Sequence, residues 1–458
     1  TFVFLYLALI FFVHSGSALA HGIGKTYTLP VPLWLYLYAS AGVVGFSFLA
    51  VGLLIKSHSA NVTSTKNVKI PPIFSKILTF LKLGSVFLFL TFILTGIFGT
   101  QNSANNFAPT FLWAIFIIAT TIGSAIFGNF WQYLNPLKII FELFEKMLNP
   151  KPLARYPVFL AKWPAVFFYL CFIWAELASA NSANPRFLGI LATFYALITL
   201  WAMAIFGKKV WLENGEFLNV VFGLFSKISP LKYEKHKLII QVPFSGLLKT
   251  SDPNFSLVYL IILTLAGTAF DGIRESALFY NLLQYTHLIN IDPSVYRTIS
   301  VALIPIPFLI IYLIFIRIAQ VLTVIKNGFL KLATNLSLSL LPISLGYFIA
   351  HFWVLLVTSG QQIIRLASDP FGYGWNLFGT AGYKSKIFLS ADFVWYSQVG
   401  AIVVGHVLAV VCAHFIALKL FKNQKQALVS QIPIAVLMVG FTVFSLWLLS
   451  QPIVISPK

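Results

Sequence analysis

Long apolar runs recur along the whole chain and constrain its fold more than any other feature. A helix that crosses a bilayer needs roughly 20 mostly apolar residues. Ten such runs follow residue 30, at 32–55, 78–99, 108–129, 161–180, 187–207, 255–272, 298–325, 332–357, 393–420 and 430–451. Charged residues make up only 9% of the 458 residues, against about 25% in a soluble domain. The sequence therefore predicts an all-α integral membrane protein, with residues 21–458 as one polytopic bundle of ten transmembrane helices.

Residues 1–20 form a further apolar run that resembles a signal peptide. The run is short and ends in small residues, Ala18-Leu19-Ala20, as signal peptides do before their cleavage site. Cleavage after Ala20 would make His21 the first residue, and its free amine and ring could then hold copper. If the run is retained as an N-terminal helix, which we expect, only the His21 ring is available.

The distribution of basic residues predicts the orientation. The net charge is +19, and Lys and Arg collect in the cytoplasmic loops of membrane proteins. With His21 outside and the first of the ten helices running inward, 23 of the 31 basic residues fall in inner loops. We expect a bacterial-type inner (plasma) membrane location with His21 and the C-terminus on the outer side. The charge then reflects topology, and no nucleic acid is expected as a partner.

Three segments between the spans have a recognisable character. Residues 134–149 and 210–228 carry apolar residues at helical spacing with charges between them, which predicts amphipathic helices on the inner surface. A packed connecting helix is the alternative for each. The outer loop 358–392 is rich in glycine and aromatic residues, and a loop this long is more often functional or partner-binding than idle.

Ionisable residues inside the predicted spans are few. Glu176 lies near the outer end of the fourth helix, Asp271 at the outer end of the sixth and His351 in the outer part of the eighth. Such residues are costly at membrane depth and mark functional sites. The simpler alternatives are that Asp271 pairs with Arg274, three residues on, and that Glu176 is solvated at a helix end.

Histidines add to this set and suggest a metal site. His406 lies at mid-depth on the ninth helix, and His21 would lie just outside the first. Imidazole and carboxylate are usual ligands of copper and zinc, so His21, Asp271, His351 and His406 are the candidate ligands. His414 is not expected to share the ion, because eight residues along a helix give about 12 Å of rise and about 80° of rotation.

Sequence motifs do not decide between the candidate chemistries. HExxH, CxxC and Walker patterns are absent, and the two cysteines, Cys171 and Cys412, lie inside apolar runs. Each intramembrane histidine has an alternative role as a hydrogen-bonded packing residue. A haem held by two histidines is a further possibility, although paired haems across a membrane usually need histidine pairs on two helices and the eighth helix offers only His351.

Several stretches resemble a family of bacterial multi-pass membrane proteins that is labelled either hypothetical protein or fenitrothion hydrolase. They are "AHGIGKTYTLPVPLWLYLY", "NFAPTFLWAIFIIATTIGSAIFGNFWQYLNP", "AFDG", "ASDPFGYGWNLFGTA" and "FVWYSQVGAIVVGHVLAVVCAH". These stretches contain His21, Asp271, His406 and His414, whereas His351 lies just outside them. The hydrolase label implies attack of an activated water on a phosphotriester, which needs a metal or a strong base.

Four functions follow as hypotheses. The first is a metal-binding subunit, of copper type, that acts within or beside a membrane redox complex and therefore has other membrane proteins as partners. The second is an ion- or proton-coupled transporter that uses Asp271, His351 and His406 as a relay. The third is a membrane-embedded metal-dependent hydrolase, and the fourth is a structural subunit. Pro305 and Pro307 interrupt the seventh helix, but its counterpart in the other half has no proline, which slightly favours the metalloprotein or the structural subunit.

Overall fold

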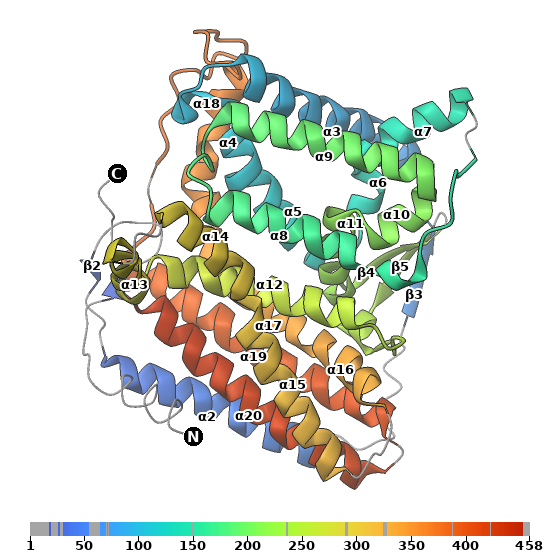
Figure 1. Cartoon of the computed structure of the whole chain (residues 1–458), viewed down its shortest axis with the longest axis vertical. Coiled ribbons are helices and arrows are strands. Elements are labelled where there is room, and N and C mark those ends of the chain that lie inside the picture. Colours follow the sequence, from blue (N-terminus) through green and yellow to red (C-terminus); the bar gives the residue numbers. More distant parts are fainter. Residues whose placement is uncertain are drawn as a thin grey trace.

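The chain folds into a bundle of helices with very little strand (Figure 1). The computed structural model describes residues 18–19, 26–27, 31–54, 65–69, 71, 73–148, 151–234, 237–288, 292–323, 328–386, 388–421 and 423–451. Within these residues, nine helical segments are long and apolar enough to cross a membrane: Leu33–Leu54, Ile73–Phe98, Phe107–Phe127, Pro185–Phe206, Phe255–Arg274, Pro293–Leu322, Phe329–Ser368, Ala391–Leu420 and Gln424–Leu449. The predicted all-α multi-pass membrane fold is confirmed.

The fourth and the seventh predicted spans differ in detail from the others. The run 161–180 forms helix α8, Trp163–Leu177, which has only 15 residues. The seventh span is divided into α14 (Pro293–Leu303) and α15 (Pro305–Leu322), because a proline removes a backbone donor and clashes with the preceding turn. The N-terminal run 1–20 lies outside the described residues except for strand β1, Ala18–Leu19, which pairs with β2, Thr26–Tyr27.

The remaining helices follow in chain order. They are α2 (Leu33–Leu54), α3 (Ile73–Phe98), α4 (Phe107–Pro109), α5 (Ile117–Phe127), α6 (Trp131–Leu134), α7 (Pro136–Leu148), α9 (Pro185–Phe206), α10 (Lys208–Asn214), α11 (Phe217–Phe225), α12 (Phe255–Arg274), α13 (Ala277–Leu288), α16 (Phe329–Ser337), α17 (Leu341–Val357), α18 (Ile363–Ser368), α19 (Ala391–Leu420) and α20 (Gln424–Leu449). Asn184, Asn254 and Ser390 cap α9, α12 and α19, each accepting a bond from a backbone amide of the first turn, and this satisfies one of the donors that a helix start leaves free.

Helix α12 forms the centre of the bundle (Figure 1). Every residue from Leu260 to Gly272 is buried, so α12 is surrounded by protein over most of its length. Below it in the view, α17 and α19 pack so closely that a Cβ added at Gly346 would lie 2.6 Å from the Ala401 carbonyl oxygen. Polar side chains on α12 and α17 therefore lie inside the protein, where they need protein or water partners.

The loops predicted for the two sides of the membrane lie at opposite ends of the bundle. A three-stranded antiparallel sheet, formed by β3 (Thr65–Lys69), β5 (Lys237–Gln241) and β4 (Leu231–Glu234), lies at the right in Figure 1 together with α7, α10 and α16. Helices α13 and α18 lie at the left. This arrangement agrees with the alternating topology that the charges predict, and which end faces the cell interior stays a prediction.

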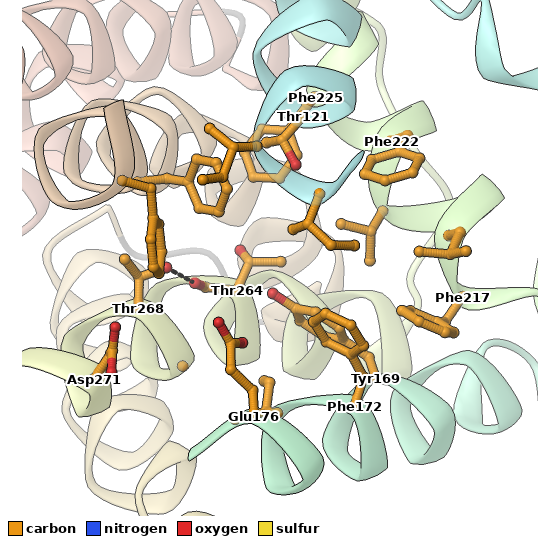
Figure 2. A pocket seen from close by; sticks show the side chains of 18 of the residues that line it. Thr121, Tyr169, Phe172, Glu176, Phe217, Phe222, Phe225, Thr264, Thr268 and Asp271 are labelled. Atoms are coloured by element: carbon orange, nitrogen blue, oxygen red, sulfur yellow. Dashed lines mark hydrogen bonds between the residues drawn. The ribbon is translucent and has the colours of Figure 1, made fainter. Parts of the chain in front are cut away.

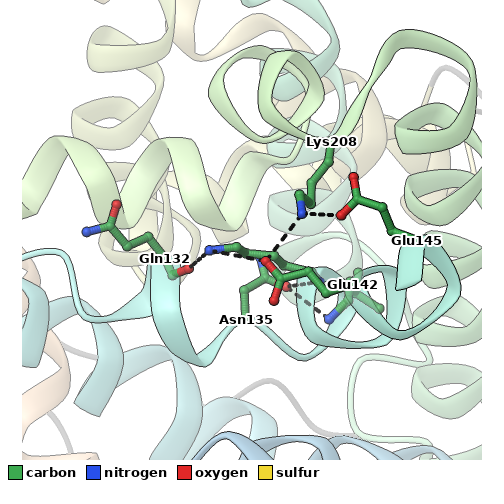
Figure 3. Close-up of polar contacts among 7 residues, drawn as sticks. Gln132, Asn135, Glu142, Glu145 and Lys208 are labelled. Atoms are coloured by element: carbon green, nitrogen blue, oxygen red, sulfur yellow. Dashed lines mark hydrogen bonds and ion pairs between the residues drawn. The ribbon is translucent and has the colours of Figure 1, made fainter. Parts of the chain in front are cut away.

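The first predicted amphipathic segment, 134–149, forms α7 and is held against α10 by ion pairs (Figure 3). Lys208 Nζ lies 2.5 Å from Glu145 Oε2 and 3.4 Å from Glu142 Oε1. Leu137 and Phe141 are buried, whereas Phe144 and Leu148 are exposed. Helix α7 thus packs by its first half and leaves apolar side chains uncovered on its second half, as expected for a helix at a membrane surface.

The second segment, 210–228, takes the packed alternative rather than the surface position. It divides at Gly215 into α10 and α11, and a short 3-10 turn, Ser226–Ile228, follows α11. Within α11, Phe217, Val221 and Phe225 are buried. An apolar helix with so little polar surface is stable only when protein or lipid surrounds all of it.

The predicted outer loop 358–392 is organised by its own polar groups. It begins with a 3-10 turn, Ser359–Gln362, and α18, and the described residues from Asp369 to Ser390 form no further helix or strand. The Asp369 carboxylate accepts bonds from the backbone amides of Tyr373 and Gly374. Arg365 donates to Asn105 and to the Ala104 carbonyl, so this loop is fastened to the start of the third span.

Candidate functional site: a buried carboxylate between an imidazole and a guanidinium

Asp271 is the most densely bonded ionisable residue among the candidate site residues. Its Oδ2 lies 2.7 Å from His351 Nε2, and its Oδ1 accepts a bond of 2.9 Å from Arg274 Nη2. The side chain of Asp271 is 9% exposed and that of His351 6% exposed. Because Arg274 follows Asp271 by three residues, the two side chains share one face of the last turn of α12. Helix α17 supplies His351 from the other side.

The structure places both side chains that the sequence associated with Asp271 next to it. The pairing with Arg274 is present, and so is the approach of His351 from another helix. Tyr347 lies one turn before His351, and their rings stack with centroids 6.2 Å apart. A Cβ added at Gly272 would lie 3.0 Å from the Tyr347 hydroxyl, so the glycine allows α12 and α17 to approach at the height of the pair.

A cavity of about 50 Å³ adjoins the pair (Figure 2). Most of its lining is aromatic and aliphatic, and we call it the polar cavity because Glu176, Asp271, Thr268, Thr264 and Tyr169 also line it. In Figure 2 the Glu176 carboxyl points up from α8 toward the Thr264 and Asp271 side of the cavity. A cavity needs roughly 10–15 Å³ to hold one water, so the polar cavity has room for about three or four waters. Glu176, which sequence analysis placed at a helix end, faces this enclosed space.

Glu275 adds a third carboxyl at the end of α12. It lies 3.7 Å from Arg274 Nη2. Burial raises the pKa of the Glu275 carboxyl, and the neighbouring Asp271 charge raises it further, because both disfavour a second negative charge in the same place. Arg274 is thus the cation that holds two carboxylates together at this end of the bundle.

The two histidines of α19 do not join the pair. His406 is buried, and its Nδ1 lies 2.8 Å from the Ile402 carbonyl oxygen of its own helix, while its Nε2 has no hydrogen-bond partner among the described residues. His414 Nδ1 lies 2.9 Å from Gln431 Oε1 on α20. The hydrogen-bonded packing role describes His414 well. His21, the fourth candidate ligand, lies outside the described residues.

The described residues do not assemble a metal site of the expected kind. They contain no group of three or more His, Cys, Asp or Glu side chains that could hold a metal ion. At Asp271 a bound cation would also have to displace or tolerate the Arg274 guanidinium, which bonds the same carboxylate. A copper or zinc ion therefore does not fit the described Asp271–His351 pair as it stands, and metal binding stays a prediction.

Sequence analysis missed a second buried carboxylate, Glu216. It is fully buried at the start of α11, where it accepts bonds from the backbone amides of Leu218 and Asn219. Asn135 Nδ2 donates to Glu216 Oε2 at 2.9 Å, and the Tyr195 hydroxyl donates to Oε1. The signal was a Glu directly before an apolar run, the position at which a helix cap stands.

Comparisons with protein-family models, with curated proteins and with solved structures find no match to this chain.

Proposed function

We propose that this chain is a proton-coupled membrane carrier in which the Asp271–His351 pair takes up and releases the proton. The observation that carries the proposal is the 2.7 Å contact between Asp271 Oδ2 and His351 Nε2, which are 80 residues apart in the sequence and buried in the bundle. Histidine changes charge within the physiological range, and ionisable groups within spans commonly form proton relays. A carboxylate that shares a proton with an imidazole is the simplest such unit.

Arg274 supports this role by fixing one oxygen of the carboxylate. Its bond to Oδ1 leaves Oδ2 directed at the imidazole. When His351 is neutral, Asp271 and Arg274 form a closed ion pair. When His351 is protonated, the extra positive charge is shared with Asp271 and with Glu275, which also lies near Arg274. The cluster can therefore hold one more or one fewer proton without leaving an unpaired buried charge, which would be costly.

Coupling of the proton to a second event needs a path away from the pair, and the polar cavity provides one. Asp271 and Glu176 both line it, so two carboxyls face a space that has room for about three or four waters. A proton can pass between Asp271 and Glu176 through such waters. Helices α8, α12 and α17 each contribute one of the three groups, so any change in their packing alters the path.

Hydrolysis has less support from the same residues. The hydroxyls of Thr264 and Thr268 donate to carbonyl oxygens of their own helix. His351 Nε2 lies against the Asp271 carboxylate, whereas a base that activates a nucleophile lies against a hydroxyl or thiol. Copper or zinc binding remains the second proposal, supported by the adjacent carboxylate and imidazole and opposed by the Arg274 ion pair.

The decisive experiment compares the wild-type protein with Asp271→Asn and His351→Gln. Purified protein is titrated with acid while its infrared carboxyl and imidazole bands are recorded, and proteoliposomes containing a pH-sensitive dye report proton entry under an imposed membrane potential. Both variants should lose one titrating group and the proton flux. Asp292→Asn, at the exposed N-cap of α14, is the matched control and should keep both.

Unchanged titration and unchanged flux in His351→Gln would refute the proton-carrying role. Metal analysis of the same preparations tests the second proposal separately. Stoichiometric copper or zinc in the wild type, lost in His351→Gln, would favour a metal site.

A further inference from the structure

A second cavity, which is apolar and has a volume of about 380 Å³, lies next to the polar cavity. It is surrounded by helices α3, α8 and α9 and by the third span, and the start of α11 completes its lining. The two cavities share the side chains of Trp113, Phe172 and Phe217 in their linings. Ligand pockets generally fall between roughly 300 and 1,000 Å³, so the apolar cavity is large enough for a ligand.

The mouth of this cavity faces outward from the membrane-spanning helices. Leu88 of α3, Phe167 of α8 and Phe194 and Ile198 of α9 all line it, and each is more than 40% exposed. These helices include two that are long and apolar enough to span a membrane. Such an opening leads to the hydrocarbon region of a bilayer, since exposed apolar side chains of this kind face lipid.

Two polar side chains in the lining of this cavity are satisfied by each other. Glu216 and Asn135 both line the apolar cavity, and they are bonded to each other. Glu216 further accepts bonds from two backbone amides and from Tyr195. Trp131 also lines the cavity, and its buried indole N–H has no hydrogen-bond partner among the described residues. The rest of the lining is mostly apolar, which suits a hydrocarbon chain.

We infer that this cavity is a binding site for the hydrocarbon chain of a bilayer-resident lipid, which enters sideways between α3, α8 and α9. The π-helical stretch Thr110–Phe116 contributes Phe111, Leu112, Trp113 and Phe116 to the lining. A π-turn widens a helix and often marks a functional site. Here the π-helical stretch places these four large side chains at the surface that the hydrocarbon chain contacts. This inference does not depend on the proton-carrying role.

The test uses protein in nanodiscs of phosphatidylcholine that contain a small fraction of phosphatidylcholine with a diazirine midway along one acyl chain. After illumination, adducts are mapped by peptide mass spectrometry. Lipid on the outer surface can reach Leu197, which is 59% exposed, but only a chain inside the cavity can reach Phe217, which is 6% exposed. Adducts on Phe217 or Leu218 are the expected result.

A second arm replaces the photoreactive phospholipid by a photoreactive isoprenoid alcohol. Labelling of α11 by the phospholipid assigns the cavity to an acyl chain, whereas labelling by the isoprenoid alone assigns it to a free polyprenyl chain. Both outcomes support a hydrocarbon-chain site and differ in its source. Labelling of Leu197 without labelling of α11 in either arm would overturn the inference.

Variants make the assignment specific. Ala192→Trp places a large side chain in the cavity, since Ala192 lines it on α9, and should reduce α11 labelling at least fivefold. Leu197→Trp adds the same side chain to the same helix on the exposed face and should leave α11 labelling unchanged. If Ala192→Trp does not fold, Leu191→Phe, which also alters the lining, replaces it. Equal α11 labelling in wild type and filled variant would contradict the inference.

Discussion

Removal of the Asp271 charge should be among the most destabilising single changes near the site. In Asp271→Asn the His351 imidazole and the Arg274 guanidinium both lose their shared carboxylate. Breaking a buried ion pair by removing one partner costs about 3–5 kcal/mol, because the other charge stays buried. Arg274 is 33% exposed and keeps Glu275 at 3.7 Å, so we expect the lower end, about 3 kcal/mol. This corresponds to roughly a 100-fold change in the unfolding equilibrium.

A double-mutant cycle separates the His351 contact from the Arg274 contact. A hydrogen bond to a charged group contributes about 1.5–3 kcal/mol, so Asp271→Asn and His351→Gln should show a coupling free energy of about 2 kcal/mol. The assay is reversible unfolding of the purified protein by sodium dodecyl sulphate in mixed micelles, followed by tryptophan fluorescence. Asp292→Asn keeps an N-cap acceptor at an exposed position and serves as the control without a change in stability.

Two results would refute this reasoning. If Asp271→Asn unfolds at the same detergent fraction as the wild type, Asp271 is solvated and the burial of the pair is wrong. If both single variants are destabilised but their effects are additive, the 2.7 Å contact contributes nothing of its own, and the role of His351 as the partner of Asp271 fails.

Three further changes test the packing around the site. Gly405→Ala should destabilise the bundle by about 1–3 kcal/mol, because its Cβ would lie 2.7 Å from the Pro342 carbonyl oxygen; Gly400→Ala on the same helix meets nothing within 4 Å and should unfold no earlier than the wild type. Glu216→Gln should cost about 3 kcal/mol in the same unfolding assay, since the new amide group faces donors and leaves them unpaired. Burial lowers the pKa of the Lys162 ammonium from 10.5 to about 8. Between these values the folded state binds fewer protons than the unfolded state, so stability rises with pH there. The free energy of unfolding of the wild type should therefore rise by about 2 kcal/mol from pH 7.5 to pH 10 relative to that of Lys162→Met. If the two proteins show parallel curves of stability against pH, the burial of Lys162 has no effect.

The spans could be predicted from the sequence because each of them must be apolar over roughly 20 residues to lie in lipid. Each of the ten runs predicted after residue 30 contains a helix, and nine of them correspond to segments long and apolar enough to cross a membrane. Most ends of these nine segments lie within a few residues of the predicted bounds. The exception, α8, was predicted at 161–180 and ends at Leu177. Apolar length says how far a helix can extend, but packing and chain direction decide where it stops. The sequence could not decide between a packed and a surface position for α11, since an amphipathic pattern is equally compatible with both.

The site could be predicted only at the level of residue type. Asp271, His351 and Glu176 were identified because they are ionisable groups in an apolar context, and these three do lie around one end of α12. His406 was identified by the same rule but is bonded to its own helix. Depth along a helix follows from the sequence, whereas the direction in which a side chain points depends on helix rotation, which tertiary packing sets.

The proposed proton site and the proposed lipid site can influence each other through side chains that line both cavities. Phe172 and Phe217 contribute to both linings and pack with ring centroids 5.5 Å apart. A hydrocarbon chain that fills the apolar cavity presses on one side of these rings, and the Glu176 carboxyl lies on the other side (Figure 2). Any displacement of the wall therefore changes the space in which waters connect Glu176 with Asp271. Occupancy of the lipid site should alter the rate of proton transfer, and protonation should alter lipid affinity by the same coupling free energy.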